Sequence, residues 1–174
     1  MKKLISLMLA ALMLFALCAC GENEDPAPDS SSEPYAPDYG ELSFVSGDVV
    51  FGIMDFADEV LDALGEPQGT FESESCAYQG KDYFYYYDGF EVMANDIDGA
   101  MRITGITLAD DTVANPQGVK IGMAVSEALS LMGDGYTHAG SVYKYLTGST
   151  LLMIEEGSDG TVTAVEYAVA ANAE

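Results

Sequence analysis

The chain has 174 residues, with 29 acidic and 6 basic side chains and a formal net charge of −23. This charge repels nucleic-acid phosphates and anionic lipid head groups, so it disfavours direct binding to either. The single histidine leaves no histidine cluster for zinc and no network for a catalytic triad, and no P-loop, dinucleotide or Gly-x-Ser-x-Gly motif is present. We therefore predict a non-enzymatic protein without a cofactor or a metal site.

Residues 1–19 have the features of a bacterial export signal. Lys2 and Lys3 precede an apolar stretch that ends at Leu17, and small residues follow it. As a helix this stretch is about 21 Å long, whereas the hydrocarbon core of a bilayer is about 30 Å thick. Leu17-Cys18-Ala19-Cys20 resembles the lipobox of bacterial lipoproteins, which implies cleavage after Ala19 and lipidation of Cys20 by thioether and palmitate chains. An ordinary secretory signal, cleaved at the same place without lipid, is the alternative.

Residues 20–40 form a segment rich in Asp, Glu, Ser and Pro. Such a composition cannot bury enough apolar surface to offset the entropy cost of ordering, so we predict a disordered acidic linker. In an extended form it would reach on the order of 60 Å from the membrane. Anchor and linker together predict a protein on the outer, extracytoplasmic face of the cell membrane, which touches the membrane through its lipid alone.

The remaining chain divides into two similar stretches, residues 41–112 and 113–174. Each begins with an amphipathic pattern that predicts a helix, over 55–64 and 124–132, and each helix is followed by a glycine, Gly65 or Gly133. Alternating β-rich runs predict strands at 72–78, 82–87, 90–94 and 101–108, and at 141–146, 150–154 and 161–169. Because short turns such as Asp98-Gly99 and Asp159-Gly160 separate these runs, the strands should be antiparallel.

We therefore predict an α+β fold of two tandem repeats, each a helix followed by an antiparallel meander. One such unit is too small to close a core, so both are expected to share one sheet with the helices on one face. Alternation along the second strand separates Tyr83, Tyr85 and Tyr87 from Phe84 and Tyr86. We predict that the three tyrosines lie on the uncovered face and contact a partner.

Short motifs in both stretches resemble the tandem repeats of the β-lactamase inhibitor protein family. The matching segments are Phe51–Met54, Val60–Asp62 before Gly65, Cys76, Gly80–Tyr85, Val119–Met123 and Glu127–Leu129 before Gly133. The pattern is also similar to that of small outer-membrane assembly lipoproteins with a single copy, and it covers about residues 42–169. The resemblance implies a concave aromatic face that clasps a partner protein, with Asp82 and Tyr83 entering the active site of an inhibited enzyme. The chain departs from the family at Lys81, which follows the glycine, and at Cys76, which lacks a disulfide partner in the domain.

Three functions remain open at this point. The first is a lipid-anchored binding module that recognises an extracytoplasmic protein or a cell-wall component through its aromatic face. The second is an inhibitor of a β-lactamase or a related cell-wall enzyme. The third is a carboxylate-dependent hydrolase, although acid pairs are expected by chance in so acidic a chain. Cys76 is interpreted as a small apolar filler in a strand, because free cysteine is usually buried.

Overall fold

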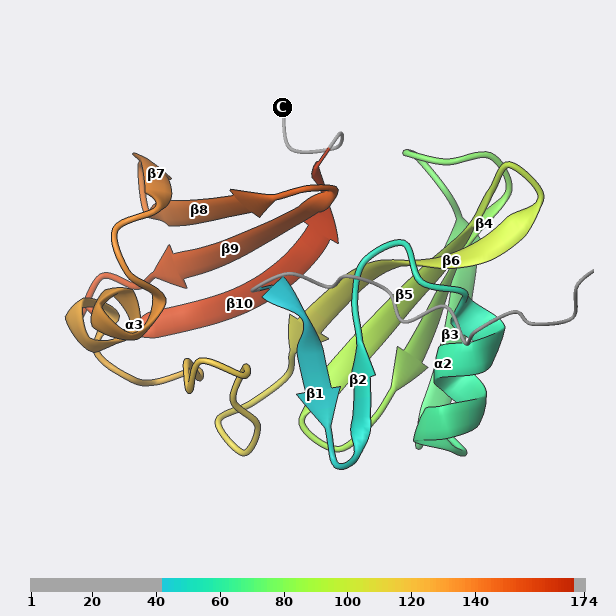
Figure 1. The fold of residues 1–174 in the computed structure, drawn as a ribbon, viewed down its shortest axis with the longest axis horizontal. Coiled ribbons are helices and arrows are strands. Elements are labelled where there is room, and N and C mark those ends of the chain that lie inside the picture. The colour runs from blue at the N-terminus through green and yellow to red at the C-terminus, as the bar shows by residue number, and fades with distance from the viewer. Residues whose placement is uncertain (1–41, 171–174) are drawn as a thin grey trace, which may run out of the picture. The chain divides into compact units, whose positions relative to one another are not determined.

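The computed structural model describes residues 42–170 and has a mixed α+β fold built mostly from antiparallel strands (Figure 1). The predicted signal peptide, the lipidation site Cys20 and the predicted linker 20–40 lie outside these residues. A hairpin of β1 (Phe44–Ser46) and β2 (Val49–Phe51) comes first, and the two helices are α2 (Ala57–Leu64) and α3 (Val125–Met132). The sheet strands are β3 (Gly69–Glu74), β4 (Lys81–Tyr86), β5 (Phe90–Ile97), β6 (Ala100–Leu108), β7 (Tyr136–Ala139), β8 (Val142–Thr147), β9 (Thr150–Glu156) and β10 (Val162–Val169). The predicted α+β class is thereby confirmed.

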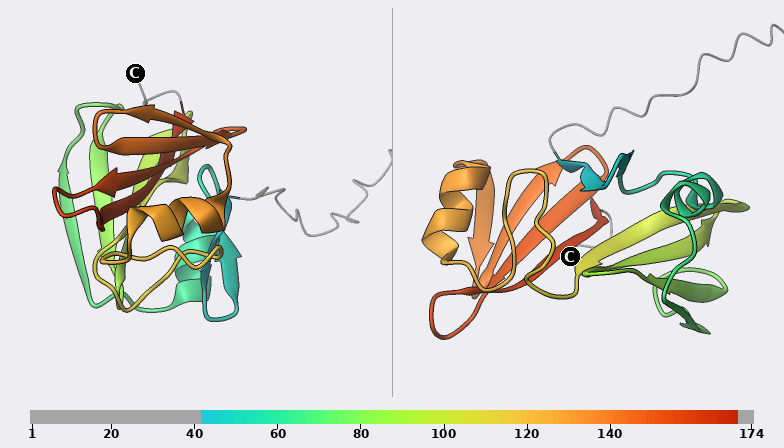
Figure 2. Two further views of the ribbon diagram at one scale, coloured as in Figure 1. Left: turned by 90° about the vertical axis from the view of Figure 1, so that its left-hand side faces the viewer. Right: turned by 90° about the horizontal axis from the view of Figure 1, so that it is seen from below.

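The eight sheet strands lie in the order β3-β4-β5-β6-β10-β9-β8-β7, and every neighbouring pair is antiparallel. The strands that follow α2 meet those that follow α3 at a single junction, between β6 and β10. Three residue pairs form this junction: Gly105 with Ala168, Ile106 with Tyr167, and Thr107 with Glu166. Figure 2 shows each helix beside the strands that follow it in the chain. That the two halves are copies of one repeat stays a prediction.

The hydrophobic core packs against one face of the sheet, which we call the inner face. The paired side chains of Val92 and Ile106 and of Tyr167 and Leu152 point to it and are fully buried. The same cluster of buried residues includes side chains from both helices and from the hairpin: Ala57, Val60, Val125, Ala128, Phe44 and Phe51. Since side chains alternate along a strand, the residues between these point to the opposite, outer face.

Each helix ends at the glycine that the sequence indicates. Gly65 and Gly133 have φ angles of +78° and +81°, which only glycine adopts without strain. Their backbone N–H groups donate to the carbonyls of Leu61 (3.0 Å) and Leu129 (2.8 Å). The helix α2 begins two residues later than expected, because the backbone before it is extended and pairs with β6.

Several boundaries differ from the prediction. The hairpin β1–β2 and the edge strand β7 were not expected. The strand β3 begins and ends a few residues earlier than the strand predicted over 72–78, with which it overlaps. Cys76 lies in the turn that follows β3 and is exposed, so its interpretation as a buried strand residue is wrong. The physical reason is local: the Ser75 N–H donates to the Gly80 carbonyl (3.0 Å) and the Ser75 hydroxyl accepts from the Tyr78 N–H (2.9 Å), which closes the turn around Cys76. Within residues 42–170 no helix has the length and apolar character needed to cross a bilayer.

Candidate functional site

The outer face of the sheet carries an unbroken apolar row that crosses seven strands. Successive members of this row are Cα partners in the register, so their side chains stand next to one another on one face. From β3 to β8 the apolar row consists of Phe71, Phe84, Met93, Gly105, Ala168, Leu151 and Leu146. An apolar face of a sheet normally packs on a core, yet this one lies opposite the core.

The side chains of the apolar row are large at its two ends and small in the middle. At the β3 end Phe71 is 56% exposed, and at the β8 end Leu146 is 65% exposed. The rings of Phe71 and Phe84 lie 5.9 Å apart. In the middle stand Gly105 and Ala168, and a Cβ at Gly105 would lie 3.3 Å from Met93 Cε, so the thioether covers the glycine. The row therefore offers two exposed apolar anchors, Phe71 and Leu146, on either side of a centre in which Gly105 and Leu151 are buried.

A second, more polar row runs beside the apolar row across all eight strands. We call it the acidic row, and its members from β3 to β7 are Gly69, Tyr86, Glu91, Thr107, Glu166, Met153, Lys144 and Thr137. Its two acids stand on either side of Thr107, at the junction of β6 and β10. Burial raises the pKa of the Glu166 carboxyl above its usual value. Burial and then the charge of Glu166 raise the pKa of Glu91.

The two residues implied by the family resemblance, Asp82 and Tyr83, are successive residues of β4 and point to opposite faces. Asp82 alternates with Phe84 and Tyr83 with Tyr85. The Asp82 Oδ1 atom accepts a hydrogen bond of 2.6 Å from Nδ2 of Asn95, which is fully buried. Neither residue lies in the β3–β4 turn, so the structure does not bring them together at one protruding tip. Their predicted contact with a target enzyme remains untested.

The predicted choice of face for Tyr83, Tyr85 and Tyr87 is wrong. Tyr83 is paired with the buried Ala94, and Tyr85 with the buried Val92, so both point to the inner face. The Tyr87 ring stacks on Phe90 at 5.1 Å, and its hydroxyl donates to the Gly65 carbonyl at 3.2 Å. Alternation correctly separated the two groups of aromatic residues, but only the pairing with β5 shows which group faces the core. Contact of these tyrosines with a partner stays a prediction; the aromatic residues of β4 on the outer face are Phe84 and Tyr86.

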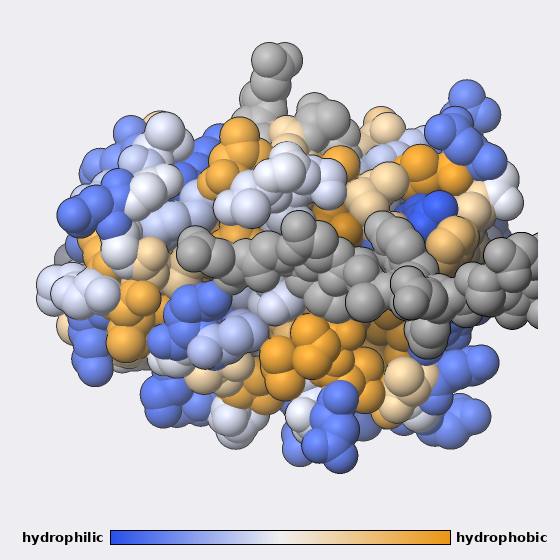
Figure 3. Space-filling model, in the orientation of Figure 1, coloured by the Kyte–Doolittle hydropathy of each residue, from blue (hydrophilic) through white to orange (hydrophobic). Residues whose placement is uncertain are grey.

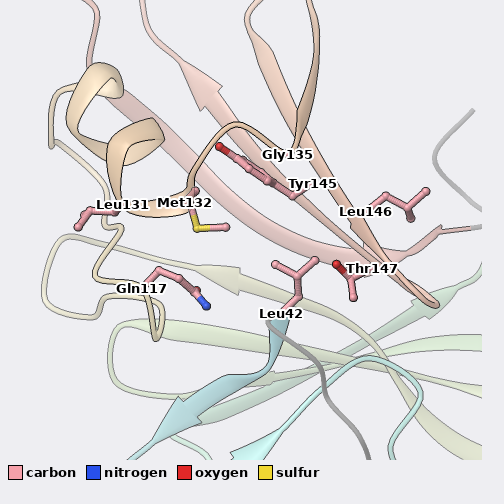
Figure 4. Close-up of a pocket in the computed structure, with 8 residues that line it drawn as sticks. All are labelled: Leu42, Gln117, Leu131, Met132, Gly135, Tyr145, Leu146 and Thr147. Atoms are coloured by element: carbon pink, nitrogen blue, oxygen red, sulfur yellow. The ribbon is translucent and has the colours of Figure 1, made fainter.

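Two further surfaces are hollowed or apolar. A hollow of about 530 Å³ lies between the end of α3, β8 and the first described residue (Figure 4), and it is lined by Leu42, Gln117, Leu131, Met132, Gly135, Tyr145, Leu146 and Thr147. The Tyr145 hydroxyl in this hollow already has a hydrogen-bond partner, since it donates to the Gly133 carbonyl (3.0 Å). Burial raises the pKa of Tyr145 to about 12. Figure 3 shows apolar surface over the β1–β2 hairpin, where Val45 and Val50 are exposed. Neither surface combines exposed apolar anchors with a neighbouring pair of acidic side chains as the outer face does.

No group of three or more His, Cys, Asp or Glu side chains that could hold a metal ion occurs within residues 42–170. Comparison of the chain with protein-family models, curated proteins and solved structures finds no match. The resemblance to the inhibitor family therefore stays a prediction from short motifs.

Proposed function

We propose that this protein is a non-enzymatic binding module, lipid-anchored outside the cytoplasmic membrane, that recognises another protein through the outer face of its sheet. The observation that carries the proposal is the apolar row, with Phe71 and Leu146 exposed at its ends. Neighbouring apolar side chains that reach solvent, here Phe71, Phe84 and Met93, seldom occur on a soluble protein without a use, and aromatic residues and methionine are enriched where proteins meet. A protein partner fits this face better than a glycan, because the row is apolar over its whole length.

We also infer that the two halves are tandem repeats with both helices on the inner face. Before α2, the Met54 N–H donates to the Ile103 carbonyl (2.7 Å), and before α3 the Gly122 N–H donates to the Val162 carbonyl (2.8 Å). Met54 and Gly122 both have positive φ, +76° and +84°. These matching bonds, at the same place before each helix, support an origin by duplication.

The irregularities of the sheet support the duplication as well. The β5–β6 pairing leaves Thr104 without a Cα partner, and the β9–β10 pairing leaves Thr163 without one. The Thr163 hydroxyl donates to the Glu155 carbonyl of the neighbouring strand (3.2 Å), and the Thr104 hydroxyl lies 3.4 Å from the Met93 carbonyl and donates to Oδ1 of Asn95. Because bulges of this kind bend a strand, two of them at matching places would curve both halves of the sheet in the same way.

The anchor is tested by metabolic labelling with a fatty acid. Cells producing the full chain are expected to yield labelled protein, and the Cys20→Ala variant is expected to lose the label entirely, because the thioether can form only at that sulfur. Gel fluorography after solvent washing measures the incorporation. Label that survives Cys20→Ala, or a wild-type chain without label, contradicts the anchor.

The outer face is tested by photo-cross-linking in intact cells. A benzophenone amino acid in place of Phe84 is expected to form a covalent product with another protein, because that side chain lies within the apolar row. The same probe in place of Val50, which is exposed on the hairpin, serves as the control. Changing Phe71 and Leu146 together to serine should reduce the Phe84 product about tenfold or more, since anchors of this size contribute about 2 kcal/mol each when an interface buries them.

Mass spectrometry identifies the cross-linked species. Equal yields from positions 84 and 50, products that contain only a second copy of this chain, or products insensitive to the double serine change each contradict the proposal. Circular dichroism of the double variant shows whether the fold is retained.

A further inference from the structure

The centre of the outer face places two carboxylates where apolar neighbours surround them. Glu91 and Glu166 flank Thr107 on adjacent strands, which puts their Cα atoms roughly 10 Å apart across the sheet. Met153 and Tyr86 are the next members of the acidic row on the two sides, and the apolar row lies alongside. The two acids therefore stand beside the middle of the apolar row, where Glu91 is half-buried and Glu166 is exposed.

This placement is unfavourable for the isolated protein. Taking a carboxylate partly out of water disfavours its charged form, and a second carboxylate nearby disfavours it further. Burial raises the pKa of the Glu166 carboxyl. Burial, followed by the charge of Glu166, raises the pKa of the Glu91 carboxyl. Glu91 is half-buried and Glu166 lies two strands away on the same face, so a neutral side chain at position 91 would avoid both its desolvation and the repulsion between the two acids.

We propose, on the basis of the proposed function, that the outer face docks a basic and apolar surface of a partner protein, with a Lys or Arg side chain of that partner seated between Glu91 and Glu166. The apolar side chains of the partner would lie on the apolar row, against Phe71 and Phe84 at one end and Leu146 at the other. A cation at the centre would replace the water that the carboxylates lose on docking. Charge complementarity of this kind also selects against wrong partners.

The charge of the chain argues against the other occupants of this face. A second copy would bring its own Glu91 and Glu166 against the first pair, and each chain carries a net charge of −23. Like charges placed opposite one another in an interface are costly. Nucleic acids and anionic membranes are repelled for the same reason.

The test uses a phage-displayed library of random 12-residue peptides, selected against the immobilised full chain. We expect the selected peptides to carry Lys or Arg next to apolar residues. They should bind the Glu91→Gln/Glu166→Gln variant about tenfold more weakly, which is the scale expected when a desolvated charge pair is lost. The control variant, Glu59→Gln/Glu127→Gln, changes the net charge equally but on the two helices, away from the outer face, and it should leave affinity within about twofold.

The pH dependence of peptide binding gives a second readout. Wild-type affinity should fall as the pH decreases through the raised pKa values of Glu91 and Glu166, because the protonated carboxyls no longer attract a cation. The Glu91→Gln/Glu166→Gln variant should lack this part of the pH dependence. The other charged groups on the outer face, Asp82, Lys144 and Glu155, are the same in both proteins and cancel in the comparison.

Each outcome decides the inference. Peptides without Lys or Arg, equal losses in the two double variants, no loss in either, or no selected peptide at all would overturn the basic-partner inference. If the Phe84 probe still captures a partner protein in cells, the proposed binding function stands while this inference falls. If the Phe84 probe captures nothing, the binding function itself falls.

Discussion

Replacing Phe44 with alanine is expected to lower the free energy of unfolding by about 3 to 5 kcal/mol, the usual cost of deleting a fully buried aromatic ring. The ring is 0% exposed and contacts both halves of the sheet. Its centroid lies 5.1 Å from that of Phe90 in β5 and 6.0 Å from that of Tyr167 in β10, and Phe51 of the hairpin packs on it at 5.5 Å. Within the described residues β1 and β2 pair only with each other, so these side-chain contacts, and not backbone pairing with the large sheet, hold the hairpin in place.

Urea unfolding followed by circular dichroism measures this change. The neighbouring residue gives a matched control, since Val45 lies on the opposite side of β1 and is 37% exposed. Val45→Ala should change the free energy of unfolding by about 0.5 kcal/mol or less. A loss below about 1 kcal/mol for Phe44→Ala would show that the hairpin is not part of the core.

The second large effect is expected at Tyr85, which the structure places on the inner face. Its side chain packs on the core and lies near Asp58 of α2, and burial, followed by the negative charge of Asp58, raises the pKa of its hydroxyl. Tyr85→Ala should therefore lower the free energy of unfolding by about 2 to 3 kcal/mol, less than for a fully buried ring because the side chain is only half-buried.

Phe71 provides the comparison for Tyr85, because it is an aromatic residue of the neighbouring strand on the outer face. Phe71→Ala is expected to cost about 0.5 kcal/mol, as for other exposed positions, while weakening partner binding. Thermal unfolding and cross-linking yield, measured on the same two variants, separate the two roles. The reverse result, with Tyr85→Ala stable and Phe71→Ala unstable, would mean that the two faces have been exchanged.

The sequence predicts those parts of the fold that depend on local chemistry. Amphipathic spacing and a terminal glycine predict both helices, and Asp98-Gly99 predicts the tight turn between β5 and β6, where both residues have positive φ. The β1–β2 hairpin was missed because each of its strands has only three residues, too few for alternation to be recognised. The positive φ that Met54 shares with Gly122 could not be predicted either, because a methionine gives no signal for that backbone conformation.

The outer face could be predicted only in part. Alternation separates Tyr85 from Phe84, but the two groups exchange roles if the strand is turned over, and a tyrosine on either face is plausible from its chemistry. The pairing of Tyr85 with Val92 shows which group faces the core, because Val92 is buried. That burial depends on residues from distant parts of the chain. The acidic pair is harder still to predict from the sequence, because Glu91 and Glu166 are far apart in the chain and become neighbours only through the junction of β6 and β10.

The early position of the hairpin in the chain gives it a mechanical role if the protein is held at its N-terminus. A pull applied upstream of Leu42 would load β1 before any other described strand, and among residues 42–170 the only strand that pairs with β1 is β2. Resistance to that load therefore comes from the side chains of Phe44 and Phe51 rather than from the backbone bonds of the large sheet. Once the hairpin peeled away, Phe90 and Tyr167 would be exposed to water on either side of the β6–β10 junction. If the predicted linker carries tension, that tension would therefore weaken the packing beneath the β6–β10 junction, where Glu91 and Glu166 flank Thr107.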